Sequence, residues 1–279
     1  MEEFVPITEL PNPLRDAMIQ DMASYSIGFF RLEDTKLGQN AFLLGSGTLV
    51  AVGDTRAVLT AHHVVRTLPR SGRLGILLSK TCGPHTIDTQ GLAFLEIARG
   101  TDDSSGPDLG AVVLAPPIAS AIAAKKRFYN LAVHRDQMLQ NPPDLHDGVW
   151  IVHGFIDEGT ERSADPGASG LSIIFYSLSC AGGPYEEAVQ IGDHDYFAFP
   201  VSLAARSVTP RSFGGMSGGG LWQVPLTRDD QGELVSKTPV LSGVVFYQEP
   251  TTDTQCGVKC HGRVSVYQSA FNSIACGKP

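Results

Sequence analysis

From Tyr25 onward, the chain consists of short runs of β-branched and aromatic residues separated by Gly, Asp and Pro. Runs of this kind at short intervals are typical of an all-β sandwich or barrel. Strands do not alternate with helices, which argues against a doubly wound α/β sheet. The expected strands are Tyr25–Leu32, Ala41–Val52, Ala57–Ala61, Leu74–Leu78, Leu92–Ile97, Leu109–Leu114, Val149–Gly154, Leu171–Leu178, Tyr196–Val201, Gly220–Gln223, Val240–Tyr247 and Gly262–Val266.

Two β units of similar size are expected, because residues Ala115 to Gly148 interrupt the strand pattern. We predict an N-terminal helical extension over 1–24, a first β unit over 25–115, a linker over 116–147 and a second β unit over 148–279. The N-terminal helix is expected from Pro11 to Ser24, because Pro suits a first turn and apolar residues recur every four positions. A closing helix is expected over Tyr267–Ala275.

The charge balance gives no reason to expect a nucleic-acid partner. The net charge is −8, and the densest basic cluster, Lys125–Arg127, has only three charges, whereas phosphate binding needs clustered Lys and Arg. The most apolar stretch, Gly110–Ala124, is broken by prolines and is shorter than the ~18–20 residues of a membrane span. The start of the chain lacks the basic and apolar parts of an export signal. A cytoplasmic protein that binds neither membrane nor nucleic acid is therefore expected.

An odd number of cysteines without an export signal favours free thiols in a reducing compartment. Cys256, Cys260 and His261, with Cys276 downstream, are zinc ligands by residue type, but the two tight pairs of zinc-finger spacing are missing. We expect no metal and no cofactor. The fold should not need disulfides, since a chain of 279 residues can bury a large core. A Cys256–Cys260 disulfide is the alternative in an oxidising compartment.

Three segments place a residue type used in catalysis beside a strand-like run, in the order His, Asp, Ser. They are Val58–Val65 with His62 and His63, Pro107–Leu114 with Asp108, and Gly214–Leu221 with Ser217.

The serine needs two kinds of help to act as a nucleophile. A base must lie within hydrogen-bond reach of the hydroxyl, and donors must stabilise the negative oxygen that forms on a substrate carbonyl. Glycines around Ser217 let the backbone turn tightly and point amides into one concavity. We expect the amides of Gly215 and Ser217 to form this oxyanion hole. A Gly-rich surface turn with an idle serine is the alternative interpretation of this segment by itself.

Histidine and aspartate supply the remaining functions. An imidazole can accept the serine proton and return it to the leaving group, and a carboxylate holds that imidazole in one tautomer. The local pattern does not choose between His62 and His63. Asp108 directly precedes an apolar strand, where a carboxylate can be partly buried. A strand-entry turn residue is the alternative for Asp108 alone, so the argument depends on the joint occurrence of the three segments.

Together these segments resemble the chymotrypsin/trypsin-like serine protease superfamily. Leu59–Val65 is similar to the family's Leu-Thr-Ala-Ala-His-Cys segment, Asp108–Leu114 to Asp-Ile-Ala-Leu-Leu, and Gly215–Leu221 to Gly-Asp-Ser-Gly-Gly-Pro-Leu. Val240–Tyr247 resembles the later strand that pairs with the substrate backbone. The matches span about Ala41 to Ala275. The resemblance implies two six-stranded antiparallel β-barrels, with a short N-terminal and a C-terminal helix added in this chain. It implies the triad His63, Asp108 and Ser217.

Departures from the family pattern point to a particular branch. Met216 stands where trypsin-type enzymes have an Asp that pairs with a newly cut N-terminus, and no Ile-Val-Gly-Gly-like start is present. Trypsinogen-style activation is therefore not expected. The disulfide pattern of the secreted members is also missing. The chain is more similar to the HtrA-like and glutamyl-endopeptidase-like branches.

The resemblance also implies a substrate-binding set. Arg211 lies six residues before the nucleophile, where the floor of the S1 pocket is expected, and a guanidinium there would favour an acidic P1 side chain. The alternative is that Arg211 faces solvent or pairs with a surface carboxylate. Phe246, Tyr247 and Gln248 are expected at the pocket wall, where Gln248 replaces a usual glycine and would narrow the entrance.

The resulting hypothesis is a serine endopeptidase that cleaves polypeptide substrates through an acyl-enzyme. One version of it is an intracellular effector of bacterial-defence type that an activating or regulatory protein partner switches on. The alternative is a catalytically silent binding or scaffold module on the same fold. Retention of all three triad residue types argues against this alternative.

Overall fold

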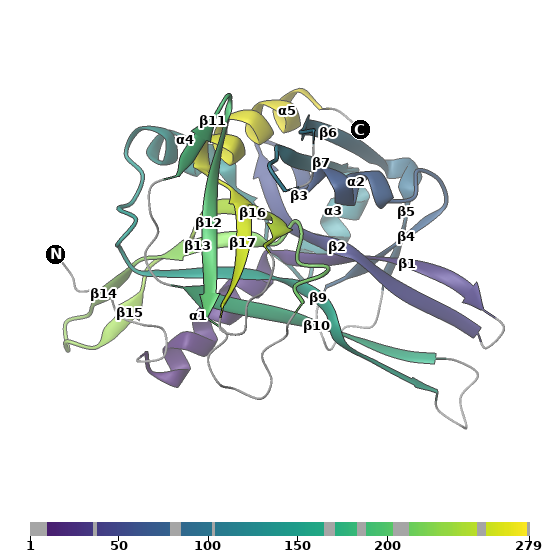
Figure 1. Ribbon diagram of the computed structural model, residues 1–279, viewed down its shortest axis with the longest axis horizontal. Helices are drawn as coiled ribbons and strands as arrows, with labels where there is room; N and C mark the ends of the chain where they lie inside the picture. The colour runs from purple at the N-terminus through teal and green to yellow at the C-terminus, as the bar shows by residue number, and fades with distance from the viewer. Residues whose placement is uncertain are drawn as a thin grey trace.

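Two curled antiparallel sheets make up most of the protein (Figure 1). The computed structural model describes residues 10–35, 38–78, 85–101, 104–164, 171–182, 188–202, 212–249 and 255–277. The prediction of an all-β fold built from two barrel-like units is confirmed, as are helices near both ends of the described chain. No helix in the described part of the chain has the length and hydropathy of a membrane span.

The first sheet has the order β5-β4-β1-β2-β3-β7-β6, and β8 is added in parallel to β2. The sequence predicted six of its eight described strands. It missed β5, which is short and polar, and β8, which has only two residues. The strands are β1 (Ser26–Thr35), β2 (Gly38–Val52), β3 (Thr55–Thr60), β4 (Arg73–Leu77), β5 (His85–Asp88), β6 (Leu92–Arg99), β7 (Asp108–Leu114) and β8 (Tyr129–Asn130).

The second sheet has the order β10-β9-β13-β16-β17-β12-β11, and β14 and β15 form a separate hairpin. In Figure 1 the paired strands β9 and β10 extend beyond the rest of this sheet toward the lower right. The strands are β9 (Val149–Ala164), β10 (Leu171–Gly182), β11 (Val189–Ile191), β12 (His194–Ser202), β13 (Gly220–Val224), β14 (Leu226–Arg228), β15 (Leu234–Ser236), β16 (Val240–Gln248) and β17 (Gln255–His261).

The expected strand over Gly262–Val266 is wrong. The last strand is β17, which ends at His261, and the chain then enters a π-helical turn, Ser265–Ala270, followed by α5, Phe271–Cys276. The cause is a cap from a distant residue: the Asp195 carboxylate accepts hydrogen bonds from the amides of Val264 and Ser265. Such a cap satisfies amides that a helix start leaves unpaired.

Helix α1, Asn12–Ser24, lies one residue inside the predicted range. The other helices are α2 (His62–Thr67), α3 (Pro116–Ala123) and α4 (Leu131–Gln140), and Thr89–Gly91 forms a 3₁₀ turn. Residues 115–148, where the sequence predicted a linker over 116–147, thus hold two helices. Asn130 caps the N-terminus of α4, because its side chain accepts hydrogen bonds from the amides of Ala132 and Val133.

Helix α1 is part of the main core, which also contains residues of both sheets. Met18 and Met22 are fully buried in the same cluster as Leu59 of β3 and Trp222 of β13. Lys126 fixes the end of the helix by donating to the Ala23 carbonyl, and Arg127 pairs with Asp21.

We expect Met22→Ala to lower the free energy of unfolding by about 2–5 kcal/mol, the usual cost of removing a buried methionine side chain. Met22 is 0% exposed, whereas Val133 on α4 is 70% exposed. Val133→Ala is therefore the control, with an expected change within about 0.5 kcal/mol. Urea unfolding followed by circular dichroism measures both. Equal midpoints for the two variants would show that α1 does not contribute to the core.

Candidate active site

His63 and Asp108 are held together at two points. The Asp108 carboxylate accepts a hydrogen bond from the backbone amide of His63 (2.9 Å) and contacts His63 Nδ1 through its other oxygen (2.5 Å). The first contact caps helix α2, and the second fixes the imidazole. A carboxylate on Nδ1 leaves Nε2 as the nitrogen that can act as a base. The His63 side chain is 39% exposed and the Asp108 side chain only 6%.

The Asp108 carboxylate is ionised at neutral pH. Burial raises the pKa of Asp108, but the hydrogen bonds from His63 and the charge of that ring oppose this effect, and the net pKa is lowered from its usual value. A buried, ionised carboxylate can stabilise the imidazolium that forms when His63 takes up a proton.

His62 has a different partner. Its buried ring contacts the Glu96 carboxylate of β6 through Nε2 at 3.1 Å, and Glu96 also accepts a hydrogen bond from Arg70 (3.0 Å). The sequence pattern alone left both histidines open. In the structure, His63 is the one of the two that contacts Asp108.

Ser217 lies in a loop whose backbone conformation requires glycine on both sides of the serine. Gly215 and Gly218 have φ angles of +94° and +92°, a region that other residues rarely adopt. A Cβ on Gly218 would collide with the Ser46 carbonyl and the Thr60 hydroxyl. Ser217 Oγ donates to the carbonyl of Phe246 (3.4 Å). Among the described residues no hydrogen bond joins His63 to Ser217, so the structure brings His63 and Asp108 into contact while the serine hydroxyl faces Phe246.

The loop carries two amide groups without acceptors in the described part of the chain, those of Gly215 and Ser217. The carbonyl of Gly214 accepts a hydrogen bond from Asp157 N (2.8 Å), and that of Met216 accepts one from Gly219 N (2.7 Å). The N–H of a trans peptide points away from its C=O. The N–H groups of Gly215 and Ser217 therefore point to the side opposite these two engaged carbonyls. There they can donate to a negatively charged oxygen of a bound substrate.

Ser46 of β2 connects the first sheet to this loop, and the sequence analysis missed it. Its hydroxyl donates to the Gly215 carbonyl (2.7 Å) and accepts from Phe155 N (2.7 Å), while its amide donates to the Ser217 carbonyl (2.8 Å). Thr48 Oγ1 adds a bond to the Gly218 carbonyl. The available sequence signal was Gly45-Ser46-Gly47 within a strand, since glycines in a strand often mark a close backbone approach.

The residues predicted at the pocket wall contribute in different ways. Phe246 is buried and presents its carbonyl to Ser217, and its ring packs against His261. Tyr247 is half-buried, with the Lys259 ammonium 5.9 Å from its ring centroid. Gln248 Oε1 accepts a hydrogen bond from the amide of Phe213 (2.8 Å), which ties β16 to the residue before Gly214. Arg211 lies outside the described residues.

Met216 and the cysteines have structural surroundings. Met216 is 1% exposed and packs in the core of the second sheet, where an ion pair would not form. Cys260 and Cys276 are free thiols, and burial raises the pKa of the Cys260 thiol far above its usual value. Cys82 and the side chain of Cys256 lie outside the described residues. In the described part of the chain no three potential metal ligands gather.

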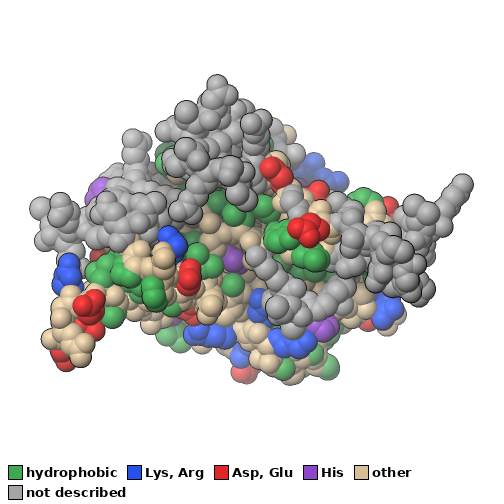
Figure 2. Space-filling model, turned by 90° about the horizontal axis from the view of Figure 1, so that it is seen from below, with side chains coloured by type: hydrophobic (Ala, Val, Ile, Leu, Met, Phe, Trp, Pro, Cys, Tyr) green, Lys and Arg blue, Asp and Glu red, His purple; other side chains and the backbone are tan. Residues whose placement is uncertain are grey.

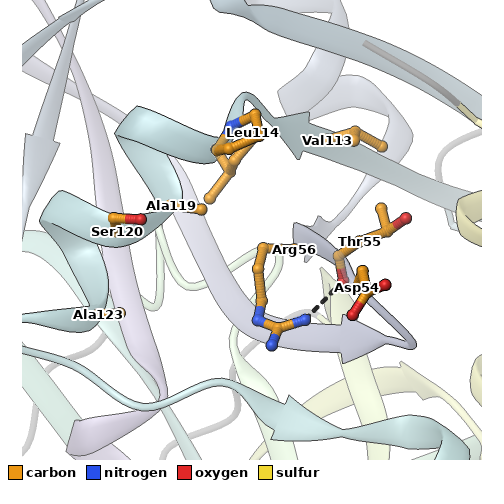
Figure 3. Close-up of a pocket in the computed structure, with 9 residues that line it drawn as sticks. Asp54, Thr55, Arg56, Val113, Leu114, Ala119, Ser120 and Ala123 are labelled. Carbon is orange, nitrogen blue, oxygen red and sulfur yellow. Dashed lines mark hydrogen bonds between the residues drawn. The ribbon is translucent and has the colours of Figure 1, made fainter.

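A separate pocket lies on the first sheet, between the turn after β2, the end of β7 and helix α3 (Figure 3). Arg56 donates to the Thr55 carbonyl (3.4 Å), the bond drawn in Figure 3, and also to the Gly53 carbonyl (2.8 Å). His63, Asp108 and Ser217 do not line this pocket.

On the face shown in Figure 2, the described basic and acidic side chains are interspersed.

No protein-family model and no curated protein sequence matches the chain. Among solved structures it is similar to HtrA-type protease AlgW with decapeptide, at 13% identity and a TM-score of 0.45, covering 92% of this chain and 66% of that one. It is also similar to tobacco vein mottling virus protease, at 11% identity and a TM-score of 0.39, covering 86% of this chain and 78% of that one.

The chain spans 66% of the length of the HtrA-type protease chain. The assignment of the fold rests on the strand order of the protein itself, with two curled antiparallel sheets, a short helix after β3 and a C-terminal helix. This is the two-barrel chymotrypsin-like fold of the trypsin-like serine proteases.

Proposed function

We propose that the protein is a serine endopeptidase that cleaves peptide bonds through an acyl-enzyme, with Ser217 as nucleophile, His63 as general base and Asp108 as the orienting carboxylate. The observation that carries this proposal is the two-point contact between Asp108 and His63. The free amides of Gly215 and Ser217 support it, because they supply the oxyanion donors that acyl transfer needs.

In the proposed mechanism, the Ser217 hydroxyl first turns from the Phe246 carbonyl toward His63 Nε2, a side-chain rotation that is fast. Nε2 takes the hydroxyl proton as Oγ attacks the substrate carbonyl carbon. The amides of Gly215 and Ser217 stabilise the resulting oxyanion, and Asp108 stabilises the imidazolium. His63 then protonates the leaving amine, so that the C–N bond breaks. A water molecule, deprotonated by His63, attacks the acyl group and releases Ser217.

A partner-activated version of this enzyme is a second form of the proposal. The Ser217 hydroxyl donates to the Phe246 carbonyl, whereas the loop carbonyls of Gly214 and Met216 are already engaged. A partner would therefore act on the position of the serine side chain, with the loop backbone unchanged. The buried free thiol of Cys260 fits a reducing compartment such as the cytoplasm for this enzyme.

The test is digestion of a peptide library by the wild type, with Ser217→Ala as the blank. Cleavage products that appear only with the wild type are expected. The products also report the residue before the cut, for which Arg211 predicts Asp or Glu. Binding of peptides without cleavage would support the scaffold alternative and contradict the proposal. Cleavage after Lys or Arg would contradict only the role of Arg211.

Ser46→Ala should lower kcat, because it removes the hydroxyl that holds the Gly215 carbonyl and so frees the adjacent loop. A loss of about 10–100-fold is expected, somewhat less than the effect of deleting an oxyanion donor outright. Ser26→Ala is the control, because Ser26 is also buried on the first sheet but donates to Met22 of helix α1. Steady-state kinetics on a peptide from the library measures both variants. Equal kcat values would show that Ser46 does not position the loop.

A further inference from the structure

We propose that His261 is a positioning residue for Asp108, acting through a buried chain of hydrogen bonds that continues to Ser265 and Asp195. The role in catalysis rests on the proposed function, because Asp108 matters to the reaction only if His63 is the base.

The central contact joins the two sheets. The backbone amide of Asp108, the first residue of β7, donates to Nε2 of His261, the last residue of β17, at 3.0 Å. Asp108 is 4% exposed and His261 is 0% exposed. A buried amide without an acceptor destabilises the folded state, because it has lost its hydrogen bond to water. His261 thus supplies from the second sheet a partner that this amide needs.

The other hydrogen bonds of this series, through Ser265 to Asp195, set the tautomer of His261. For Nε2 to accept, the ring proton must be on Nδ1, and Nδ1 lies 3.3 Å from Ser265 Oγ. Ser265 Oγ in turn donates to the Asp195 carboxylate (2.9 Å). Burial lowers the pKa of His261 to about 3, so that the ring stays neutral and its Nε2 remains an acceptor at neutral pH. The hydrogen bonds therefore run in one direction, from Asp108 through His261 and Ser265 to Asp195.

The series of hydrogen bonds ends at Asp195, a residue that is itself held in place. Asp195 also accepts hydrogen bonds from the amides of Val264 and Ser265, which begin the C-terminal helix. Position 262 must be glycine, because a Cβ there would collide with the Asp195 carboxylate. The His261 ring packs against the rings of Phe246 and Tyr196, with centroids at 4.8 and 5.2 Å, and these two rings also contact each other. The imidazole therefore has little freedom to leave its place beside Asp108.

This arrangement bears on the geometry of catalysis, because Asp108 begins β7 of the first sheet, whereas Ser217 lies in the loop before β13 of the second sheet. The Pro107 carbonyl accepts a hydrogen bond from Gly100 N, so the peptide before Asp108 is held within the first sheet. The bond from Asp108 N to His261 holds the other end of that peptide against the second sheet. A shift of about 1 Å in such a group can cost about 100-fold in rate.

The test compares His261→Leu, which removes the acceptor, with His261→Gln, whose amide oxygen can replace Nε2. His153→Leu is the matched control: His153 is also buried, with a pKa lowered to about 3 and a Ser179 Oγ partner at 2.6 Å, but it has no contact with Asp108. Two properties are measured, the rate of labelling by a fluorophosphonate and the downfield proton NMR signal of His63 Nδ1–H. Assignment of that signal uses His63→Ala.

We expect His261→Leu to slow labelling about 10- to 100-fold and to shift or broaden the His63 signal, and His261→Gln to restore both to within about 3-fold of the wild type. His153→Leu should leave both near wild type. The proposal would be overturned if His261→Leu matched His153→Leu, or if His261→Gln were as impaired as His261→Leu. If the wild type itself resists labelling, the proposed function fails, and the His63 signal alone decides whether His261 positions Asp108.

Discussion

Ser217→Ala is expected to lower kcat about 10⁶-fold with little change in KM, since removing a nucleophile abolishes acyl transfer but leaves substrate contacts in place. The Ser217 hydroxyl bonds only weakly to the Phe246 carbonyl, at 3.4 Å, so its loss should cost little stability. Steady-state kinetics on the best library peptide measures the effect. Ser120 is an exposed serine on α3, so Ser120→Ala is the control and should keep the wild-type kcat.

A kcat of Ser217→Ala far above one millionth of the wild-type value would contradict the assignment of Ser217 as nucleophile. If Ser217→Ala kept a tenth of the wild-type kcat, another group would have to attack the carbonyl. An unchanged thermal midpoint in the same preparation excludes unfolding as the cause of any loss.

Asp108→Asn should lower kcat about 10⁴-fold, the loss known for removing this charge from a Ser-His-Asp triad. The reason is the tautomer. The Asp108 carboxylate accepts from both His63 N and His63 Nδ1. An Asn side chain has one acceptor and one donor, so an NH₂ facing Nδ1 forces the ring proton onto Nε2. The base would then point its proton at Ser217 and could not accept one.

The control for this prediction is Glu96→Gln, which makes the same chemical change at the carboxylate beside His62. It should leave kcat within about 3-fold of wild type, because His62 does not contact Asp108 and exposed ion pairs contribute little. Equal losses for Glu96→Gln and Asp108→Asn would contradict the assignment of His63 as the base.

The sequence predicted the sheets from local pattern, because β-branched runs and turn residues are local signals. It failed where the signal came from a distant residue. Gly262–Val266 has the composition of a strand, yet the Asp195 carboxylate makes it the start of a helix. Likewise, β5 and β8 depend on neighbouring strands more than on their own residues.

The residues of the candidate site also fall into those that the local sequence pattern predicted and those that depend on distant residues. The segments around His63, Asp108 and Ser217 could be found in the sequence because each catalytic residue type adjoins an apolar run. Separating His62 from His63 needed the positions of β6 and β7, which present Glu96 to one ring and Asp108 to the other. Ser46 and His261 act across more than 150 residues of sequence, so no local spacing marks them.

The central claim is that Ser217 is an activated nucleophile. The most direct measurement is incubation with a fluorophosphonate, followed by intact-mass and peptide mapping. The account predicts one adduct on the wild type, located on Ser217, which forms far more slowly with Asp108→Asn and not at all with Ser217→Ala. Failure of the folded wild type to react while trypsin is labelled in parallel, or an adduct on another residue, would contradict it.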